Sequence, residues 1–458
     1  MVMGELPENV DLAVVGGGVG GYVAAIRAAE LGLNVVLVEK EKLGGHCLNY
    51  ACIPSKTLIH IADIFHEIGN SEKFGIKASG AEIDAKKMLE WRLGVSKKLE
   101  GGVEFLCRQN GIEVMKSEAT FLNSGSIQLQ EGMILKFGKA IIATGSEPVN
   151  LPGFEFGGSI IDYKKALMLD SIPKNMVIIG AGYVAVELGM LYAKLGSKIS
   201  IIARTDVLSR VDKDAVDLIK GEMKGLGIDV YTNETPKAHD GRSVVLSNGK
   251  SLDADVTVVA IGLAPYTKNL GLENTKVRLD GRGFVQVDGS MRTSDANILA
   301  IGDVVGEPML AHKAMRQGVV AAEVARGMNS SFDNLVIPSV IFSDPEIALA
   351  GSIEEREGIR VIKFPLSALG RSIALDTTRG FAKIAYEENG VVKGVEIVSR
   401  EASSMISEAV LAIEMGATVD DIAETIHPHP TYSEAVQEAA EAAIGAPIHF
   451  FYGKPREE

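Results

Sequence analysis

VDLAVVGGGVGGYVAAIRAAELGLNVVLVEK, residues 10–40, decides the fold. An apolar run is followed by a glycine-rich turn, a helical pattern that ends in Leu-Gly, and a second apolar run, which is the order of a βαβ unit. Gly16 permits the tight turn, Gly18 lets the backbone approach a pyrophosphate, and Gly21 lets the helix pack closely on the strand. The segment therefore predicts a dinucleotide site with its phosphates at the helix N-terminus. Glycines that serve only a tight turn are the weaker interpretation, because the whole strand–turn–helix–strand context is present.

The same pattern occurs a second time. Residues 174–204 read KNMVIIGAGYVAVELGMLYAKLGSKISIIAR, and they align without a gap so that Gly16 matches Gly180 and Gly18 matches Gly182. A repeat of this kind predicts two dinucleotide sites.

The second strands of the two copies end differently. The first ends with Glu39, where a carboxylate can accept hydrogen bonds from ribose hydroxyls. The matching position in the second copy is Ala203, followed by Arg204. The two sites are therefore expected to bind different nucleotides.

Composition excludes several classes of protein. A net charge of −14 in 458 residues argues against a general affinity for nucleic acid or for anionic membranes. No stretch reaches the roughly 18 apolar residues of a membrane span, and the first residues lack the basic and apolar regions of a signal peptide. Three cysteines do not make a disulfide scaffold. We expect a cytoplasmic protein of roughly two to four domains.

Two of the cysteines, Cys47 and Cys52, lie five positions apart in GGHCLNYACIPSK, residues 44–56. In a regular α-helix their Cα atoms would be about 8.7 Å apart, whereas a disulfide needs less than about 7 Å. A disulfide here requires that the chain leave helical geometry between the two cysteines. Zinc is disfavoured because no second pair of ligands accompanies them, and no metal is expected. From these residues alone, buried core cysteines and a redox pair are both open.

Three later apolar segments resemble strands that end at a ligand. AIIATGSEP (140–148) and VTVVAIGLAP (256–265) end in small residues, and ANILAIGDV (296–304) places Asp303 after a glycine. A carboxylate in that position can hold a polyol or ribityl chain, or it can cap a turn. A helical pattern begins at Ala311, and its N-terminus could face an anionic ring oxygen.

The pattern changes near residue 336. RGFAKIAYEENGVVKGVEIVS predicts antiparallel strands around a Glu-Asn-Gly turn, and two helical patterns follow. In HPHPTYSEA, Glu434 lies five residues after His429, where a further helix begins. A histidine oriented by a carboxylate is a general acid/base arrangement. A structural surface histidine is the alternative.

Together these motifs resemble the pyridine nucleotide–disulfide oxidoreductases over almost the whole chain. CLNYACIPSK, MLAHKA, SVIFSDPEIA and HPTYSEA leading into AAIGAPIHF are most similar to the dihydrolipoamide dehydrogenases of that family. The resemblance implies a flavoprotein that oxidises dihydrolipoamide to lipoamide through a Cys47–Cys52 redox disulfide and passes hydride to NAD(P)+. The rivals are a reductase of glutathione disulfide or a coenzyme A disulfide, and a flavin-binding structural subunit.

The resemblance also implies the architecture. The fold would be α/β, with two Rossmann-like dinucleotide-binding domains of the glutathione-reductase type and a C-terminal α+β dimerisation domain. The expected FAD-binding, NAD(P)-binding, central and interface domains are residues 1–148, 149–268, 269–335 and 336–458. The partners implied are a second copy of the chain and the lipoyl groups of a 2-oxo acid dehydrogenase or glycine-cleavage complex.

Roles for the catalytic residues follow from the same resemblance. Cys52 would be the flavin-proximal sulfur and Cys47 the thiol that exchanges with substrate. His429, oriented by Glu434, would be the acid/base and would come from the other subunit of a homodimer.

Two sets of residues are implied at the cofactors. Lys56 would lie near the flavin ring, paired with Glu187. The set expected around FAD is Gly16, Gly18, Gly21, Glu39, Lys56, Thr144, Gly145, Asp303, Met309, Leu310, Ala311 and His312. The set expected around NAD(P) is Gly180, Gly182, Glu187, Ala203, Arg204, Arg210 and Gly262.

The sequence departs from the family pattern in three places. His46 stands where threonine is common, Ala51 stands where glycine is common, and Met315-Arg316-Gln317 replaces an acidic stretch. His46 would add a titratable group beside the cysteine pair. Cys107 is expected to be a structural core residue.

A preference for NADP is expected from the second βαβ unit. Ala203 provides no carboxylate to repel a 2′-phosphate, and guanidinium groups such as those of Arg204 and Arg210 can hold a phosphate with paired hydrogen bonds. Ala185 replaces the third glycine, as in NADP-binding members of the family. Solvated surface arginines are the alternative, and Asp206 between them could neutralise part of their field.

Overall fold

The computed structural model describes residues 9–78 and 80–451. The chain forms two compact units. Unit 1 contains the chain up to residue 173 together with residues 255–333, and unit 2 contains residues 174–254 and the chain from residue 334. Within the described residues, no helix is long and apolar enough to cross a membrane.

A seven-stranded sheet forms the centre of unit 1, in the order β3-β2-β1-β6-β5-β4, with β17 paired to β6. Its strands are β1 (Val10–Val15), β2 (Val35–Glu39), β3 (Glu113–Lys116), β4 (Ala119–Asn123), β5 (Ser126–Leu129), β6 (Ile134–Ile142) and β17 (Ile298–Ala300). β1 is parallel to both β2 and β6, as the predicted βαβ unit requires. β1 and β2 are almost entirely buried, so they read as continuous apolar runs.

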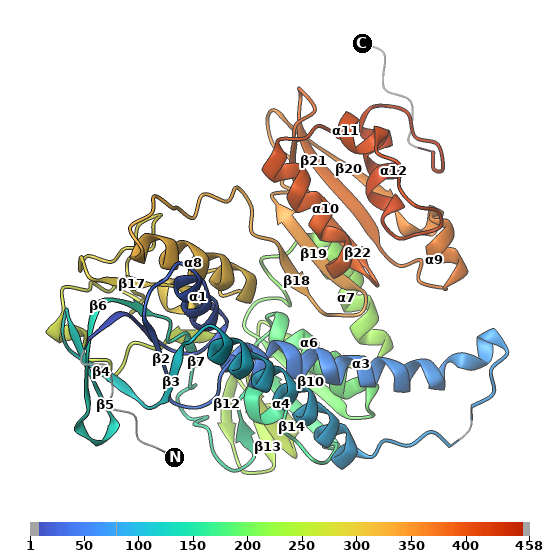
Figure 1. Cartoon of the computed structure of the whole chain (residues 1–458). Coiled ribbons are helices and arrows are strands. Elements are labelled where there is room, and N and C mark those ends of the chain that lie inside the picture. Colours follow the sequence, from blue (N-terminus) through green and yellow to red (C-terminus); the bar gives the residue numbers. More distant parts are fainter. Residues whose placement is uncertain (1–8, 79, 452–458) are drawn as a thin grey trace. The chain divides into compact units, whose positions relative to one another are not determined.

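The helices of unit 1 are α1 (Val19–Glu30), α2 (Gly45–Asn49), α3 (Cys52–Gly69), α4 (Ala85–Gln109), α5 (Tyr163–Ala166) and α8 (Ala311–Ala325). α1, α4 and α8 pack on strands of this sheet. α1 and α8 lie side by side (Figure 1) because glycines let their backbones approach. A Cβ added at Gly318 would lie 2.6 Å from the carbonyl oxygen of Gly20, and one added at Gly21 would lie 1.8 Å from that of Gly16. The close packing expected at Gly21 is confirmed.

Two short pairs complete the regular structure of unit 1. β7 (Ser146–Pro148) is antiparallel to β16 (Leu263–Pro265). β8 (Ile160–Ile161) is parallel to β15 (Val256–Val259). Residues 255–268, which the sequence suggests as part of the second domain, therefore belong to unit 1. The four domain boundaries stay a prediction.

Unit 2 begins with the second βαβ unit. Its elements are β9 (Asn175–Ile179), α6 (Tyr183–Lys194), β10 (Lys198–Ala203), α7 (Lys213–Gly225) and β11 (Asp229–Thr232), and then the small antiparallel sheet β12 (Pro236–His239), β13 (Ser243–Leu246) and β14 (Ser251–Asp253). The two copies match in detail. The Gly180 N–H donates to Ile202 as the Gly16 N–H donates to Val38. The predicted repeat is confirmed.

An antiparallel sheet forms the rest of unit 2, in the order β18-β19-β22-β21-β20. Its strands are β18 (Ser339–Ile341), β19 (Glu346–Gly351), β20 (Ile359–Pro365), β21 (Phe381–Glu387) and β22 (Val392–Ser399), and its helices are α9 (Gly370–Ala374), α10 (Ala402–Met415), α11 (Val419–Glu424) and α12 (Glu434–Ala443). α10 and α12 bury their apolar faces on this sheet (Figure 1). The predicted hairpin and the three predicted helices are confirmed.

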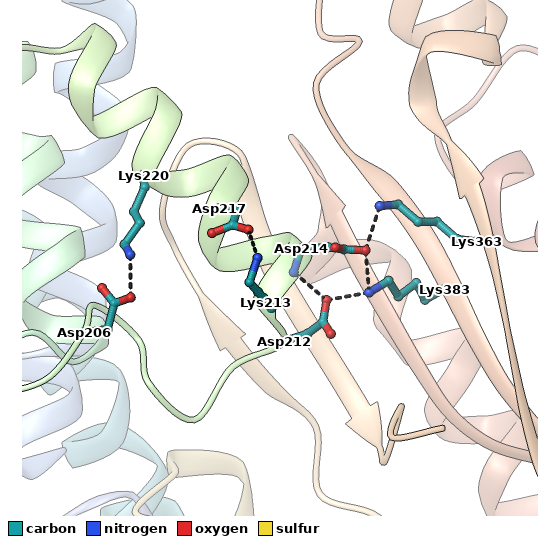
Figure 2. Close-up of polar contacts among 8 residues, drawn as sticks. All are labelled: Asp206, Asp212, Lys213, Asp214, Asp217, Lys220, Lys363 and Lys383. Carbon is teal, nitrogen blue, oxygen red and sulfur yellow. Dashed lines mark hydrogen bonds and ion pairs between the residues drawn. The ribbon is translucent and has the colours of Figure 1, made fainter. Parts of the chain in front are cut away.

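Ion pairs connect α7 to this sheet within unit 2 (Figure 2). Lys383 of β21 contacts Asp212 at 2.5 Å and Asp214 at 3.0 Å, and Lys363 of β20 contacts Asp214 at 2.8 Å. Glu396 lies across from Lys383 on β22 and is fully buried. Burial raises the pKa of Glu396 to about 8, the nearby Asp212 carboxylate adds to the rise, and Lys383 opposes it.

The raised pKa of Glu396 predicts a loss of stability as pH rises. Because the folded-state pKa lies above its ordinary value of 4.5, the folded chain keeps a proton that the unfolded chain releases. The contribution is fully present below pH 4.5 and is lost as pH rises through about 8. We expect a decline on the order of 5 kcal/mol across this window. Chemical denaturation at a series of pH values should show this decline in the free energy of unfolding in wild type and not in Glu396→Gln.

Glu388→Gln is the matched control for this measurement, because Glu388 is exposed in the turn after β21. The free energy of unfolding should fall with pH in Glu388→Gln as much as it does in wild type. An unchanged slope in Glu396→Gln would show that Glu396 is ionised in the folded protein at neutral pH.

Candidate functional site

The first glycine-rich turn lies between the end of β1 and α1. Gly16 has φ +106°, a conformation that side chains disfavour, and a Cβ there would lie 2.3 Å from the Ala143 carbonyl oxygen. Glu39, the last residue of β2, accepts from the Gly17 N–H at 2.7 Å and from the Glu41 N–H at 2.7 Å. Burial raises the pKa of Glu39, while these two hydrogen bonds oppose the rise. The turn and the carboxylate thus form one site, as predicted.

A dinucleotide fits the open end of this turn. Gly18 is the N-cap of α1, no side chain caps the helix, and a Cβ added at Gly18 would meet nothing within 4 Å. The first N–H groups of α1 therefore lack a side-chain partner at the place where phosphate binds helices. Gly17, Gly18 and Glu39 together fit the pyrophosphate and ribose of the ADP half of FAD.

The residues expected at the rest of FAD lie in unit 1 as well. Thr144 and Gly145 follow β6, and the Thr144 hydroxyl donates to the Tyr266 carbonyl at 2.7 Å. Asp303 follows β17 in a short 3₁₀ helix and accepts from the Ser146 hydroxyl at 2.7 Å. Burial raises the pKa of Asp303. A half-buried polar acceptor of this kind suits a hydroxylated chain.

The segment Met309–His312 leads into α8, which begins at Ala311 as predicted, with Leu310 as its N-cap. Two buried residues hold this end in place. Lys313 donates to the Gly306 carbonyl at 2.6 Å, and Gln317 accepts from the Gly302 N–H at 2.8 Å. Gln317, part of the stretch that departs from the family pattern, thus fixes the turn that carries Asp303.

The helix is interrupted between Cys47 and Cys52, as a disulfide would require. Cys47 is in α2, Tyr50 and Ala51 leave helical geometry, and α3 begins at Cys52. A hydrogen bond with Cys52, together with burial, raises the pKa of Cys47.

Ala51 and Lys56 lie beside this pair. Ala51 has a negative φ of −134°, so this position does not need the positive φ for which glycine is favoured. Lys56 of α3 is a positive charge near Cys47 and opposes the rise of its pKa. Glu187 of α6 is buried and accepts from the Phe342 N–H at 3.1 Å. Lys56 and Glu187 belong to different units, and their pairing stays a prediction.

His46 is the titratable group expected beside Cys47, and its environment keeps it neutral at neutral pH. Burial, with Lys164 and Lys40 nearby, lowers the pKa of His46 to about 4. Lys164 Nζ lies 2.9 Å from His46 Nε2, and the Tyr163 hydroxyl lies 3.4 Å from His46 Nδ1. Because a lysine can only donate, Nε2 is the acceptor and Nδ1 carries the proton.

The second glycine-rich turn also presents an uncapped helix. Gly180 has φ +118°, and Gly182 is the N-cap of α6 with open space where a Cβ would be. β10 ends at the buried Ala203, and Arg204 and Arg210 are exposed. Gly262 has φ +130° and belongs to unit 1, so its place beside this turn stays a prediction.

Asp206, which lies between the two arginines in sequence, has a lysine partner, and its effect on the field of the arginines stays a prediction. It accepts from Lys220 of α7 at 2.5 Å, as Figure 2 shows. That hydrogen bond lowers the pKa of Asp206.

His429 and Glu434 form the expected pair. His429 Nδ1 lies 2.7 Å from Glu434 Oε1, and Glu434 Oε2 accepts from the Thr431 N–H at 2.7 Å. Glu434 is the first residue of α12, where the helix dipole favours a carboxylate. The His429 side chain is 76% exposed. The pair is a surface histidine with a fixed ring, and Nε2 is available to exchange a proton with a group outside unit 2.

Several polar residues near these sites were not anticipated. His427 lies 2.8 Å from Glu408, which raises its pKa. Arg92 of α4 is fully buried and donates to the Asn49 carbonyl at 2.5 Å. No periodic or motif signal marks Arg92, Lys164 or Glu408, because their partners are distant in sequence.

Two family models match the chain. One, described as pyridine nucleotide-disulphide oxidoreductase, matches residues 10–318. The other, described as the dimerisation domain of the same family, matches residues 337–440.

Curated relatives match over nearly the full length. The chain is similar to a dihydrolipoyl dehydrogenase of Geobacillus stearothermophilus, with 46% identity over 98% of this chain and 99% of that protein. It is 43% identical to one of Bacillus subtilis over 98% of this chain and 99% of the other. An archaeal dihydrolipoyl dehydrogenase, from Haloferax volcanii, is 40% identical over the same shares.

Solved structures show the same fold. LpdA from Mycobacterium tuberculosis has a TM-score of 0.88 at 24% identity, over 95% of this chain and 100% of that one. The HOCl-induced flavoprotein disulfide reductase RclA from Escherichia coli has a TM-score of 0.86 at 25% identity, over 94% of this chain and 99% of that one.

Proposed function

Because the chain belongs to the pyridine nucleotide-disulphide oxidoreductase family, we propose that it oxidises dihydrolipoamide to lipoamide with FAD and NAD(P)+. The observation that carries the proposal is the interrupted helix, which brings Cys47 into hydrogen-bond contact with Cys52. The curated relatives that bear the name dihydrolipoyl dehydrogenase support the choice of substrate. No observation favours a glutathione-type substrate or a purely structural role.

The chemistry is a thiol–disulfide exchange. A dihydrolipoamide thiolate attacks the Cys47 sulfur of the oxidised pair, which breaks the Cys47–Cys52 bond and forms a mixed disulfide. His429 takes the proton of the attacking thiol, because the thiolate is the nucleophile. The second substrate sulfur then displaces Cys47 and leaves as lipoamide. FAD, when bound, accepts the two electrons and passes hydride to the nicotinamide.

Turnover with two substrates tests this proposal. FAD-loaded protein should reduce NAD(P)+ with dihydrolipoamide and should be inactive with glutathione disulfide and reduced nicotinamide. The absence of lipoamide activity from flavin-loaded protein would refute the assignment, and activity with glutathione disulfide would favour the first rival.

We also propose a homodimer with a composite site. The matched dimerisation domain supports pairing, and unit 2 exposes large apolar side chains: Leu411, Met415, Ile426 and Ile448. A second copy would cover these side chains. The lipoyl groups of a 2-oxo acid dehydrogenase or glycine-cleavage complex are the partners we propose, and a cytoplasmic location stays a prediction.

NADP is the nucleotide that we propose for the second βαβ unit. In the first βαβ unit, Glu39 accepts a hydrogen bond from a glycine N–H of the turn. The matching residue of the second unit is Ala203, which has no carboxylate. Arg204 follows Ala203 directly and is exposed, and Asp206 is paired with Lys220.

We therefore expect a higher kcat/KM with NADP+ than with NAD+, and a reversal in Ala203→Glu/Arg204→Leu. Loss of a charge-assisted contact to the 2′-phosphate costs roughly 1.5–3 kcal/mol, or about 10- to 150-fold in kcat/KM for NADP+. The carboxylate added by Ala203→Glu should raise kcat/KM for NAD+, because it can accept hydrogen bonds from the ribose hydroxyls. Steady-state kinetics with both nucleotides measures the change.

Arg242→Leu is the control for the nucleotide variant, because Arg242 is an exposed arginine of the same unit outside the glycine-rich turn. It should leave the preference unchanged. A strong wild-type preference for NAD+, unaffected by loss of Arg204, would contradict the NADP assignment.

A further inference from the structure

The interruption between α2 and α3 has an energetic cost. Tyr50 (φ −136°, ψ −10°) and Ala51 (φ −134°, ψ −96°) take the backbone out of the helix. A helix that ends leaves its last carbonyl groups without intrahelical donors, and buried carbonyls need other partners. A continuous helix would satisfy those carbonyls and would separate the two cysteines beyond disulfide reach.

Two side chains of α4 satisfy the carbonyl groups at this break. The Ser96 hydroxyl donates to the Leu48 carbonyl at 2.9 Å, and Arg92 Nη2 donates to the Asn49 carbonyl at 2.5 Å. Both bonds are buried. Arg92 and Ser96 are four residues apart, which places them on one face of α4.

Arg92 is an unusual side chain for this position. It is 2% exposed, and among the described residues its Nε has no hydrogen-bond partner. Burial lowers its pKa, which shows that the site disfavours the charge. An apolar side chain would fill the same space without desolvating a guanidinium. The hydrogen bond to the Asn49 carbonyl, at the negative end of α2, offsets part of this cost.

We propose that Arg92 and Ser96 are positioning residues of the redox pair: by holding the Asn49 and Leu48 carbonyls, they keep the chain between Cys47 and Cys52 out of helical geometry. The proposal rests on the function proposed above, in which these cysteines interconvert between dithiol and disulfide. Oxidation of the pair removes two electrons and two protons and forms the Cys47–Cys52 bond, with the substrate disulfide or NAD(P)+ as the oxidant. Without the two α4 donors, the segment samples helical conformations in which the sulfurs cannot meet. The disulfide is then disfavoured relative to the dithiol.

The test measures the redox equilibrium of the cysteine pair in FAD-loaded protein. Wild type, Arg92→Met, Arg92→Lys and Ser96→Ala are equilibrated in buffers of lipoamide and dihydrolipoamide, and the thiols are trapped and counted by mass. We expect Arg92→Met to shift the ratio toward dithiol by about tenfold or more, which is about 30 mV for this two-electron couple. Arg92→Lys keeps a donor and should recover much of the shift, and Ser96→Ala should shift less than Arg92→Met. kcat should change with the shift, while KM for the nicotinamide should not.

Lys97→Met is the control on α4, because Lys97 is exposed; its equilibrium should match wild type. A wild-type ratio in FAD-loaded Arg92→Met, or in Ser96→Ala if Arg92→Met does not fold, would overturn the positioning role. A shift in Arg92→Met that Arg92→Lys does not reduce would overturn it too, because packing alone would then explain the effect. A wild-type protein that never forms the Cys47–Cys52 disulfide would instead refute the proposed function, and this inference with it.

Discussion

Cys47→Ser and Cys52→Ser are each expected to lower lipoamide turnover by at least about 1,000-fold while FAD stays bound. A serine oxygen cannot form the disulfide through which both electrons must pass. The cysteines lie in α2 and α3, whereas Gly18, Glu39 and Asp303 are on other segments of unit 1, so the flavin site should survive. Steady-state kinetics and the visible absorption of the flavin measure the two parts of this prediction.

The two variants should differ spectroscopically. The assigned roles place the Cys52 sulfur against the flavin and the Cys47 sulfur toward substrate. Loss of Cys52 should therefore remove the charge-transfer absorption of a thiolate beside oxidised flavin, and loss of Cys47 should retain it. The hydrogen bond with Cys52 raises the pKa of Cys47, which favours Cys52 as the thiolate of the reduced pair.

Cys107→Ala is the matched control. Cys107 lies in α4 and is completely buried among apolar side chains. Its replacement should cost roughly 1–2 kcal/mol of stability and leave turnover within about twofold. Substantial activity in Cys47→Ser would refute its exchange role, and a collapse of turnover in folded Cys107→Ala would make it a third functional cysteine.

The elements that could be predicted from sequence have local signals. The roles of Gly16 in the turn and of Gly21 in helix packing could be predicted, because the glycine spacing that marks both is a local signal. The His429–Glu434 contact spans five positions, and prolines and a helix start fix it. The spacing of Cys47 and Cys52 made the break at Tyr50 a condition for a disulfide, since two cysteines five apart cannot bond in a helix, but it did not show that the two are paired.

The polar environment of the site could not be predicted. Lys164 contacts His46 across 118 positions, and Arg92 contacts Asn49 across 43. Such contacts follow from packing of distant elements, which a single sequence does not encode as a pattern. The pKa of His46 illustrates the consequence: its neighbour in sequence is Cys47, but burial and Lys164 determine its charge.

His429→Gln is expected to lower kcat for dihydrolipoamide oxidation by about 10²- to 10⁴-fold, the usual contribution of a general acid/base. Glutamine keeps a polar side chain of similar reach but cannot take a proton from the substrate thiol.

Glu434→Gln should lower kcat less than His429→Gln does, because Glu434 acts by holding His429 Nδ1 at 2.7 Å and does not itself exchange the proton. His427→Gln is the control, since His427 is a buried histidine bound to Glu408 and its loss should affect stability more than kcat.

Mixing inactive subunits tests whether the acid/base comes from the partner. In a heterodimer of Cys47→Ser and His429→Gln subunits, a composite arrangement gives one site with both defects and one with neither. Random mixing should then recover about a quarter of wild-type activity, because about half of the dimers are mixed and each has one intact site. Each parent homodimer has two defective sites and stays inactive. Mass-verified heterodimers without activity would show instead that His429 acts on the cysteine pair of its own chain, and the exposed apolar side chains of unit 2 would need another explanation.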